Sequence, residues 1–392
     1  MLEAAQSISL SANQIVSYDV VLCDNIMDVV SKCVEFDAED DTNTVRGVFV
    51  DAGLPEHFKR HFLEKLSSIG VHYVATEVPG DEENKVLPEV LKVVEQMNAL
   101  GVKRRSAPCI VIGGGVALDV VGFAASLYRC RVPYIRVPTT LLSMVDVGVA
   151  AKTAANYLGY KNRIGTFHPA ALTLVFPEYL STLPRRQISN GAGEIFKLAV
   201  IKDKDLFDTL DHYGPTFISA RELYSDETKD IILRSLNGMA VELENNLWEY
   251  NLQRVVDYGH SFSPLVEMTY INELLHGEAV TLDCLFSAIL SFNRDHLSGK
   301  ELERLFNVAK KLGLPTFHRG FADVSLLEKA LKDTKIHRNG SQNLPLMDGI
   351  GSALFVNDIS SNEIQRASEL MAQLSTLTEI LSIPAGVQRV RY

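Results

Sequence analysis

The chain has 392 residues, of which 46% are hydrophobic and 22% are charged, and its formal net charge is −11. This composition is typical of a globular protein, and the length predicts two domains. The negative charge argues against nonspecific nucleic-acid binding, which requires a broad basic surface, whereas an anionic small molecule needs only a local cationic pocket.

No apolar run reaches the roughly 18 to 20 residues that span a bilayer, and residues 1–14 contain no basic segment followed by a continuous apolar core. We therefore expect a cytoplasmic protein that does not contact membranes. The five cysteines are an odd number without a CxxC pair, which argues against a disulfide framework and against a thiolate zinc site. We interpret them as buried thiols.

The first half of the chain alternates between two kinds of apolar pattern. Strand-like segments lie at residues 18–23, 46–50, 72–75 and 109–112, and helical patterns lie at residues 55–69 and 88–100. This alternation predicts a parallel, doubly wound sheet. From about residue 183 onward, long amphipathic runs lie at residues 192–201, 228–244, 277–293, 300–312 and 324–331. The sequence therefore predicts an α/β domain over residues 1–180 and a mainly helical domain over residues 181–392.

A glycine triplet, Gly113 to Gly115, lies between the strand at 109–112 and the apolar helical segment VALDVVGFAASLY. A strand, a glycine turn and a helix N-terminus can bind a pyrophosphate, because backbone N–H groups point outward and no Cβ blocks the approach. Asp51, which ends the strand RGVFVD, could accept bonds from a ribose hydroxyl. A tight structural turn explains the glycines equally well, and a turn or helix-capping role explains Asp51.

The stretch from Arg129 to Pro169 interrupts its apolar runs with many polar residues, among them Thr139, Asp146, Lys152 and Lys161. Cationic and amide donors packed beside an Asp suit an anionic, hydroxyl-rich ligand such as a sugar phosphate. We interpret the stretch as one wall of a site. The alternative is an ordinary strand followed by a solvated basic loop.

A second set of polar residues consists of Glu194, His260 and His276. One Glu and two His are the protein ligands of an open catalytic zinc site, in which the fourth position is left for water or substrate. The three residues are far apart in the sequence, so their spacing does not test this hypothesis. A histidine bonded within the core or lying at the surface is the alternative for each His.

Six motifs in this chain together resemble the sugar phosphate cyclase superfamily, whose best-known member is 3-dehydroquinate synthase. They occur in the family's order, and the resemblance runs from about residue 18 to residue 358: GGGVALDVVGF, PTTLLSMVD, KNRIGTFHP, NGAGEIFK, DYGHSFSP and LLHGEAV. The resemblance implies an N-terminal Rossmann-like NAD domain, a helical metal-binding C-terminal domain, a homodimer, and a site in the cleft between the domains.

Residue roles follow from the resemblance by motif match. One divalent metal, zinc or cobalt, would be bound by Glu194, His260 and His276. Catalytic groups would include Asp146, Lys152 and Lys197, and Lys161 and Asn162 would bind the substrate. The nicotinamide cofactor, NAD, would meet Asp51, Glu82, Lys85, Gly114, Gly115, Asp119, Thr139, Thr140 and Thr182.

Three positions around the DYGHSFSP motif depart from the 3-dehydroquinate synthase pattern. Gln253, Asp257 and Pro264 stand where that family has Arg, Asn and His. An Asp would repel a substrate carboxylate, whereas a neutral hydroxymethyl group could donate to it, so we expect a substrate without the carboxylate. Arg254 is the candidate to replace the missing arginine in substrate binding.

The segment DTKIHRNG places His337 near a lysine position of 3-dehydroquinate synthases, and Lys335 is a further substrate-binding candidate. Asp257 and His337, as catalytic groups, resemble the branch of 2-epi-5-epi-valiolone synthases, which cyclise the sugar phosphate sedoheptulose 7-phosphate. The implied reaction combines transient oxidation by NAD, phosphate elimination, re-reduction and intramolecular aldol closure to a C7 cyclitol. Desmethyl-4-deoxygadusol synthase, with Ala and Thr at those two positions, and 3-dehydroquinate synthase are alternatives, and a metal-dependent polyol dehydrogenase is a more distant one.

Overall fold

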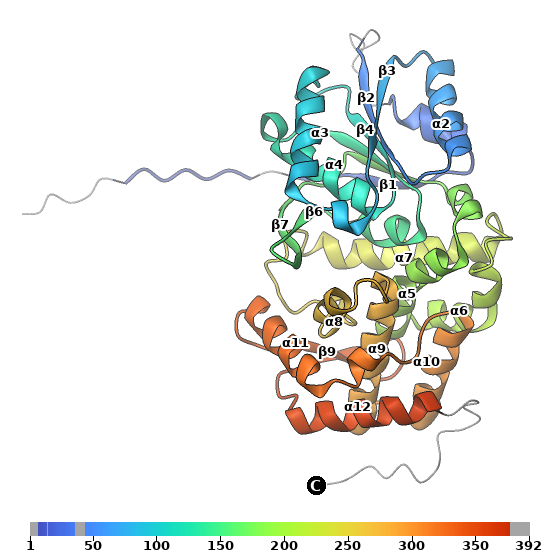
Figure 1. The fold of residues 1–392 in the computed structure, drawn as a ribbon, viewed down its shortest axis with the longest axis vertical. Helices are drawn as coiled ribbons and strands as arrows, with labels where there is room; N and C mark the ends of the chain where they lie inside the picture. Colours follow the sequence, from blue (N-terminus) through green and yellow to red (C-terminus); the bar gives the residue numbers. More distant parts are fainter. Residues whose placement is uncertain (1–6, 14, 36–43, 377–392) are drawn as a thin grey trace, which may run out of the picture.

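The structure is a computed structural model that describes residues 7–13, 15–35 and 44–376 (Figure 1). Its N-terminal half contains a six-stranded sheet, in the order β1-β8-β5-β4-β2-β3, in which all neighbouring strands are parallel. The strands are β1 (Asp19–Leu22), β2 (Arg46–Asp51), β3 (Tyr73–Val78), β4 (Cys109–Gly113), β5 (Tyr134–Pro138) and β8 (Leu172–Val175).

Helices cover both faces of this sheet because successive strand residues point to opposite sides. Val48 and Ile110 belong to the same core cluster as Phe58, whereas Phe49 and Val111 belong to the cluster that contains the other pair of helices. The sheet is therefore doubly wound, as predicted. The four helices are α1 (Ile26–Lys32), α2 (Glu56–Ser68), α3 (Leu87–Ala99) and α4 (Gly115–Leu127).

The C-terminal half is mainly helical, so the predicted fold class is confirmed. Its central helix, α9, is buried along almost its whole length and contacts α5, α8, α10 and α12. Helices α6 and α12 and the hairpin β9 to β10 were not predicted. No helix among the described residues is long and apolar enough to cross a membrane. The elements are α5 (Arg185–Ile201), α6 (Lys204–Phe217), α7 (Asp226–Glu244), α8 (Ser263–Thr269), α9 (His276–Asn293), α10 (Gly299–Lys311), α11 (Val324–His337), β9 (Leu344–Met347), β10 (Ala353–Val356) and α12 (Ser361–Thr376).

A separate antiparallel hairpin, β6 (Lys152–Tyr157) and β7 (Tyr160–Phe167), lies between the two halves. Its turn residues, Leu158 and Gly159, both have positive φ angles, +50° and +76°, which match the right-handed twist of the strands. The hairpin packs on α3 and α4 on one side, and β7 contacts α8 on the other. The alternative of a solvated loop after β5 is therefore wrong for this segment.

The prediction for the cysteines is correct for four of the five. Cys23, Cys33, Cys109 and Cys284 are buried free thiols, but Cys130 is exposed. Cys130 lies in a run of three residues with positive φ, from Arg129 to Arg131, where the chain turns sharply between α4 and β5. The expectation of burial is therefore wrong at Cys130, which lies in this turn and not in the sheet or an α-helix.

Candidate active site

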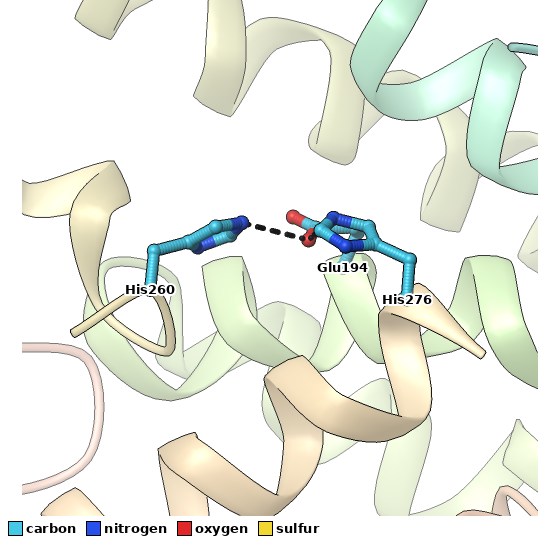
Figure 2. A group of neighbouring side chains, drawn as sticks. All are labelled: Glu194, His260 and His276. Carbon is cyan, nitrogen blue, oxygen red and sulfur yellow. Dashed lines mark ion pairs between the residues drawn. The ribbon is translucent and has the colours of Figure 1, made fainter. Parts of the chain in front are cut away.

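The structure brings Glu194, His260 and His276 together (Figure 2). The Oε1 atom of Glu194 lies 3.6 Å from Nε2 of His260 and 3.3 Å from Nε2 of His276. Figure 2 shows the two imidazoles on either side of the carboxylate, and one ligand atom from each residue lies within 4.8 Å of the others. Three ligand atoms at such spacing can surround a single cation while leaving a fourth position open.

Close helix packing positions Glu194 and His276. Helices α5 and α9 cross where Gly193 and Gly277 lie, and a Cβ at Gly277 would be only 1.8 Å from the carbonyl oxygen of Asn190. The Asn190 side chain also accepts a hydrogen bond from the N–H of Gly277, at 2.6 Å. Only glycine permits this approach, which brings the Glu194 carboxylate to the first turn of α9, where His276 lies.

The loop that carries His260 is fixed on the same helix. The buried carboxylate of Asp283, in α9, accepts hydrogen bonds from the N–H groups of Phe262 and Ser263, at 2.6 and 2.7 Å. Gly259 has a φ of +76°, and a Cβ there would be 2.7 Å from Sγ of Cys284. The backbone before and after His260 is thus held against α9, which fixes where its imidazole points.

The Glu194 carboxylate supplies a direct test of whether a metal fits this cluster. Its Oε1 is buried and has no hydrogen-bond partner, whereas Oε2 pairs with Nζ of Lys197 at 2.5 Å. Burial would raise the pKa of Glu194, but Lys197 and the two histidines hold it well below its usual range. An ionised oxygen that is buried without a donor and lies beside two imidazole nitrogens fits a divalent cation.

The two histidines have opposite protonation tendencies in the metal-free protein. Burial, together with the charge of Lys197, lowers the pKa of His260 to about 4. Burial also acts to lower the pKa of His276, but the Glu267 carboxylate outweighs it and raises that pKa to about 9. The Nδ1 atom of His276 lies 3.0 Å from Oε2 of Glu267, so its Nε2 is the atom that faces Glu194.

Asp146 lies in a π-helical turn, η4 (Ser143–Val147), beside the metal-ligand cluster. Burial raises its pKa, and the negative charge of Glu194 raises it further, while Lys197 acts in the opposite direction. Turns of this rare type are frequent at functional sites. A carboxyl group with a raised pKa beside a buried cation can hold or release a proton during a reaction.

The backbone after this turn is fixed by side chains from the sheet. Four consecutive carbonyl groups, from residue 147 to residue 150, each accept a hydrogen bond from a side chain. Arg136 donates to the first and last of them, both at 2.7 Å, Thr173 donates to the second at 2.8 Å, and Tyr18 donates to the third at 2.9 Å. The position of Asp146 therefore depends on β5 and β8 and on the residue before β1.

The predicted pyrophosphate turn lies where a doubly wound sheet forms its crevice. Strands β2 and β4 are neighbours, and the chain leaves them in opposite directions, so their carboxyl ends border a crevice. Asp51, at the end of β2, accepts hydrogen bonds from the N–H groups of Gly53 and Gly114, at 2.8 and 2.9 Å. A Cβ at Gly113 would be 2.5 Å from that of Asp51, so the close approach of this turn to the end of β2 requires glycine.

The other residues expected to meet NAD lie on several elements. Lys85 and Asp119 form a buried ion pair at 2.5 Å. Glu82 accepts a hydrogen bond from the side chain of Asn156 at 2.8 Å. Thr139 is buried, and Thr140 bonds with the Ser143 hydroxyl, whereas Thr182 is exposed at the end of a short 3-10 helix.

A chain of charged residues borders the expected substrate side. Lys152 lies 3.5 Å from one oxygen of Glu249, whose other oxygen pairs with Arg254 at 2.5 Å. Arg254 also pairs with Asp257 at 3.0 Å, and Asp257 lies 3.5 Å from Arg338. Asp257 thus lies between two guanidinium groups, which offset its negative charge. Arg254 already pairs with two carboxylates, so it is not a free substitute for the missing arginine.

The structure does not bring every expected substrate residue to this chain of charges. His337 and Lys335 are exposed at the end of α11, whereas their neighbour Arg338 is buried and reaches Asp257. Asn162 is exposed on β7, and its N–H donates to the side chain of Asn156. Lys161 pairs with Glu267 at 2.5 Å and therefore points toward the metal-ligand cluster.

Three residues of the site were missed by the sequence reasoning: Glu249, Glu267 and Arg338. Glu267 had a visible signal, because it is the one acid in the otherwise uncharged helix SPLVEMT, seven residues after His260. No sequence signal pointed to Glu249, because it lies in an irregular polar loop, where its φ is +55°. Arg338 was one residue from the candidate that was chosen.

Comparisons with known proteins agree with this geometry. Residues 75–190 match the family model described as 3-dehydroquinate synthase N-terminal, and residues 191–336 match the one described as 3-dehydroquinate synthase C-terminal. A 2-epi-5-epi-valiolone synthase from Streptomyces hygroscopicus subsp. jinggangensis is 41% identical over 370 residues, which cover 93% of this chain and 89% of the relative. A demethyl-4-deoxygadusol synthase from Trichormus variabilis is 30% identical over 96% of this chain and 91% of the relative.

The solved structures include the same Streptomyces enzyme, ValA, with NAD+ and Zn2+ bound. It superposes with a TM-score of 0.88 at 41% identity and covers 93% of this chain and 99% of its own. Both halves of the chain, their motifs and their arrangement are accounted for by one family. The chain belongs to the 3-dehydroquinate synthase family of sugar phosphate cyclases, with 2-epi-5-epi-valiolone synthases among its relatives at about 41% identity.

Proposed function

We propose that this protein is a 2-epi-5-epi-valiolone synthase, which cyclises sedoheptulose 7-phosphate with release of phosphate. The observation that carries the proposal is the cluster of Glu194, His260 and His276, in which a buried carboxylate oxygen without a donor faces two imidazoles. The cluster lies beside Asp146 and Lys197, so the residues that would hold a metal, a carboxyl group for proton transfer and a buried cation lie in one site.

The branch of the family is supported by a graded similarity. Four relatives named 2-epi-5-epi-valiolone synthase are 38% to 42% identical over 93% of this chain, and a fifth is 36% identical over 76%, compared with 30% for the demethyl-4-deoxygadusol synthase. Asp257 supports the same branch, because it differs from the Asn that 3-dehydroquinate synthases are expected to have. Its pairing with Arg254 and Arg338 gives it a fixed position from which to accept a substrate hydroxyl.

NAD and zinc fit the residues present. Glu194, His260 and His276 would hold the metal, and the turn from Gly113 to Gly115 with Asp51 would hold the dinucleotide. When bound, NAD supplies a reversible hydride acceptor, and zinc supplies a Lewis acid that lowers the pKa of a hydroxyl. ValA, the structural neighbour at 41% identity, has both groups bound.

The chain's own residues would then manage protons and charge. Asp146, with its raised pKa, is placed to exchange a proton with a substrate hydroxyl. Lys197 is a buried cation whose pKa is raised because Glu194 and Asp146 outweigh the effect of burial, so it stays charged and can stabilise developing negative charge. Lys152 is more exposed, which suits contact with the phosphate that leaves.

The test is to incubate the protein with NAD and a divalent metal, separately with sedoheptulose 7-phosphate and with the carboxylated seven-carbon substrate of 3-dehydroquinate synthase. We expect phosphate release and a C7 cyclitol from the first substrate only, without net formation of NADH. Net NADH would favour a polyol dehydrogenase. Turnover of the carboxylated substrate would favour a 3-dehydroquinate synthase, and a gadusol-type product from the first substrate would favour the sister branch.

We also propose a cytoplasmic homodimer built from two domains that meet near residue 180. The family resemblance supports the dimer, and the absence of a membrane-spanning helix among residues 7–13, 15–35 and 44–376 is compatible with the location. The boundary is supported by the end of the last sheet strand at Val175 and the start of α5 at Arg185. Light scattering of the purified protein tests the dimer.

A further inference from the structure

We infer that Lys161 is a positioning residue for the metal ligand His276, and that it acts through Glu267. The inference rests on the proposed function, since it concerns how the metal site is held. It assigns roles to two groups, a lysine from the N-terminal hairpin and a glutamate from α8, that would not touch the metal themselves. It also replaces the expectation that Lys161 binds the substrate.

The first step is that both oxygens of the Glu267 carboxylate are in use. Oε2 lies 3.0 Å from Nδ1 of His276, and Oε1 lies 2.5 Å from Nζ of Lys161. The carboxylate is only 7% exposed, so the loss of either partner would leave a buried oxygen without a hydrogen bond, which costs free energy. With Nδ1 of His276 committed to donate to Glu267, its Nε2 is the nitrogen that faces Glu194, 3.3 Å away, and the one that would bind the metal.

The second step is that Lys161 holds Glu267 from the other half of the molecule. Lys161 lies on β7, and Glu267 lies on α8, and these two elements contact each other. The ammonium group also lies 3.9 Å from Glu82, which belongs to the cofactor side. Lys161 thus lies between two carboxylates and, at 18% side-chain exposure, has little room to face a substrate as well.

The third step is the consequence for metal binding. A carboxylate that orients a ligating histidine typically changes metal affinity about 10- to 100-fold when it is removed. Because Lys161 restrains that carboxylate, zinc affinity of the C-terminal ligands should depend on a residue of the N-terminal hairpin. Removal of Lys161 should weaken zinc binding less than removal of Glu267, because the carboxylate would still reach His276 without the lysine.

The experiment measures zinc affinity of the full-length protein by competition with a chromophoric chelator, in the absence of substrate. All variants are measured at the same pH and buffer. We expect Glu267→Gln to weaken zinc binding about 10- to 100-fold and Lys161→Met to weaken it roughly 3- to 10-fold. The double variant should match Glu267→Gln within about twofold, because Lys161 acts through Glu267.

The matched control is Arg163→Met, which removes another cation from the same strand. The Arg163 guanidinium stacks on the Tyr160 ring, 5.0 Å from its centroid, so this variant should keep the parental zinc affinity. Melting temperatures of the metal-free variants report on folding. A Lys161→Met protein with parental zinc affinity but a raised KM for sedoheptulose 7-phosphate would overturn the inference in favour of substrate binding. Additive losses in the double variant would overturn the route through Glu267. A parental protein that binds no zinc would instead refute the proposed function.

Discussion

Zinc affinity is predicted to depend strongly on pH, because one ligand must lose a proton before it can bind the metal. In the metal-free cluster, Glu267 outweighs the effect of burial and raises the pKa of His276 to about 9. Burial and the charge of Lys197 lower the pKa of His260 to about 4, so this ligand is already neutral at pH 7. Zinc binding should therefore release one proton, and that proton should come from His276.

The size of the effect follows from the pKa of about 9 for His276. At pH 7 about one molecule in a hundred has the neutral imidazole, so the apparent zinc affinity is about 100-fold, or about 2.7 kcal/mol, below its limiting value. Zinc affinity should increase with pH, because the pKa of His276 is raised and its proton competes with zinc until the pH exceeds that pKa. Just above pH 7 the zinc affinity rises nearly tenfold per pH unit. The gain becomes smaller as the pH approaches 9, and the affinity levels off above about pH 9.

Chelator competition across this pH range measures how steeply zinc affinity rises with pH. The measured values are corrected for protonation of the chelator. Calorimetry in two buffers of different ionisation enthalpy counts the released protons at pH 7. Glu267→Gln is the matched variant, because without the carboxylate the pKa of His276 should fall and the levelling-off should move to lower pH. A zinc affinity that stays flat between pH 7 and pH 9 in the parental protein would refute this reasoning.

Four further substitutions test other parts of the site. His260→Ala removes one of three ligands, so turnover and zinc content should both be lost, and normal zinc content would contradict the assignment. Lys152→Ala should slow phosphate release about 100-fold, and a collapse of NAD affinity instead would place Lys152 on the cofactor side. Lys85→Met leaves the buried Asp119 carboxylate without its cation, so the free energy of unfolding measured in urea should fall by about 3 kcal/mol; an unchanged value would show that the pair is not needed. Asp257→Asn leaves two neighbouring arginines less compensated, so a carboxylated substrate should be accepted more readily and sedoheptulose 7-phosphate bound less well; unchanged preference would remove Asp257 from the choice of substrate.

The sequence predicted the parts of the fold that depend on local pattern. The strands around Val48 and Ile110 are short apolar runs that end at turn residues, whereas the apolar run after Gly114 is long enough for a helix. The pairing of β6 with β7 was not predicted, because its turn residue Leu158 has none of the usual turn chemistry. The metal ligands were proposed because their residue types suit zinc, but only the crossing of α5 and α9 and the loop held by Asp283 bring them together.

The remaining site residues show where sequence reasoning stops. His337 was predicted to be a catalytic group together with Asp257, yet its neighbour Arg338 is the residue that contacts Asp257. One residue along a helix rotates the side chain by about 100°, so an error of one position at a helix end exchanges an exposed group for a buried one. Lys161 was assigned to the substrate because its charge suits phosphate, and only the packing of β7 against α8 shows that Glu267 already pairs with it.

The strand order also has a consequence for synthesis of the chain. Strand β1, Asp19–Leu22, lies at the edge of the sheet and pairs with β8, which begins at Leu172, about 150 residues later. At roughly 5 to 20 residues per second, a ribosome needs on the order of 10 to 30 seconds to deliver that partner. During this time β1 and the open side of β5 both have unpaired backbone groups. Nascent chains that stall before Leu172 are therefore expected to be substrates for chaperones and prone to aggregation.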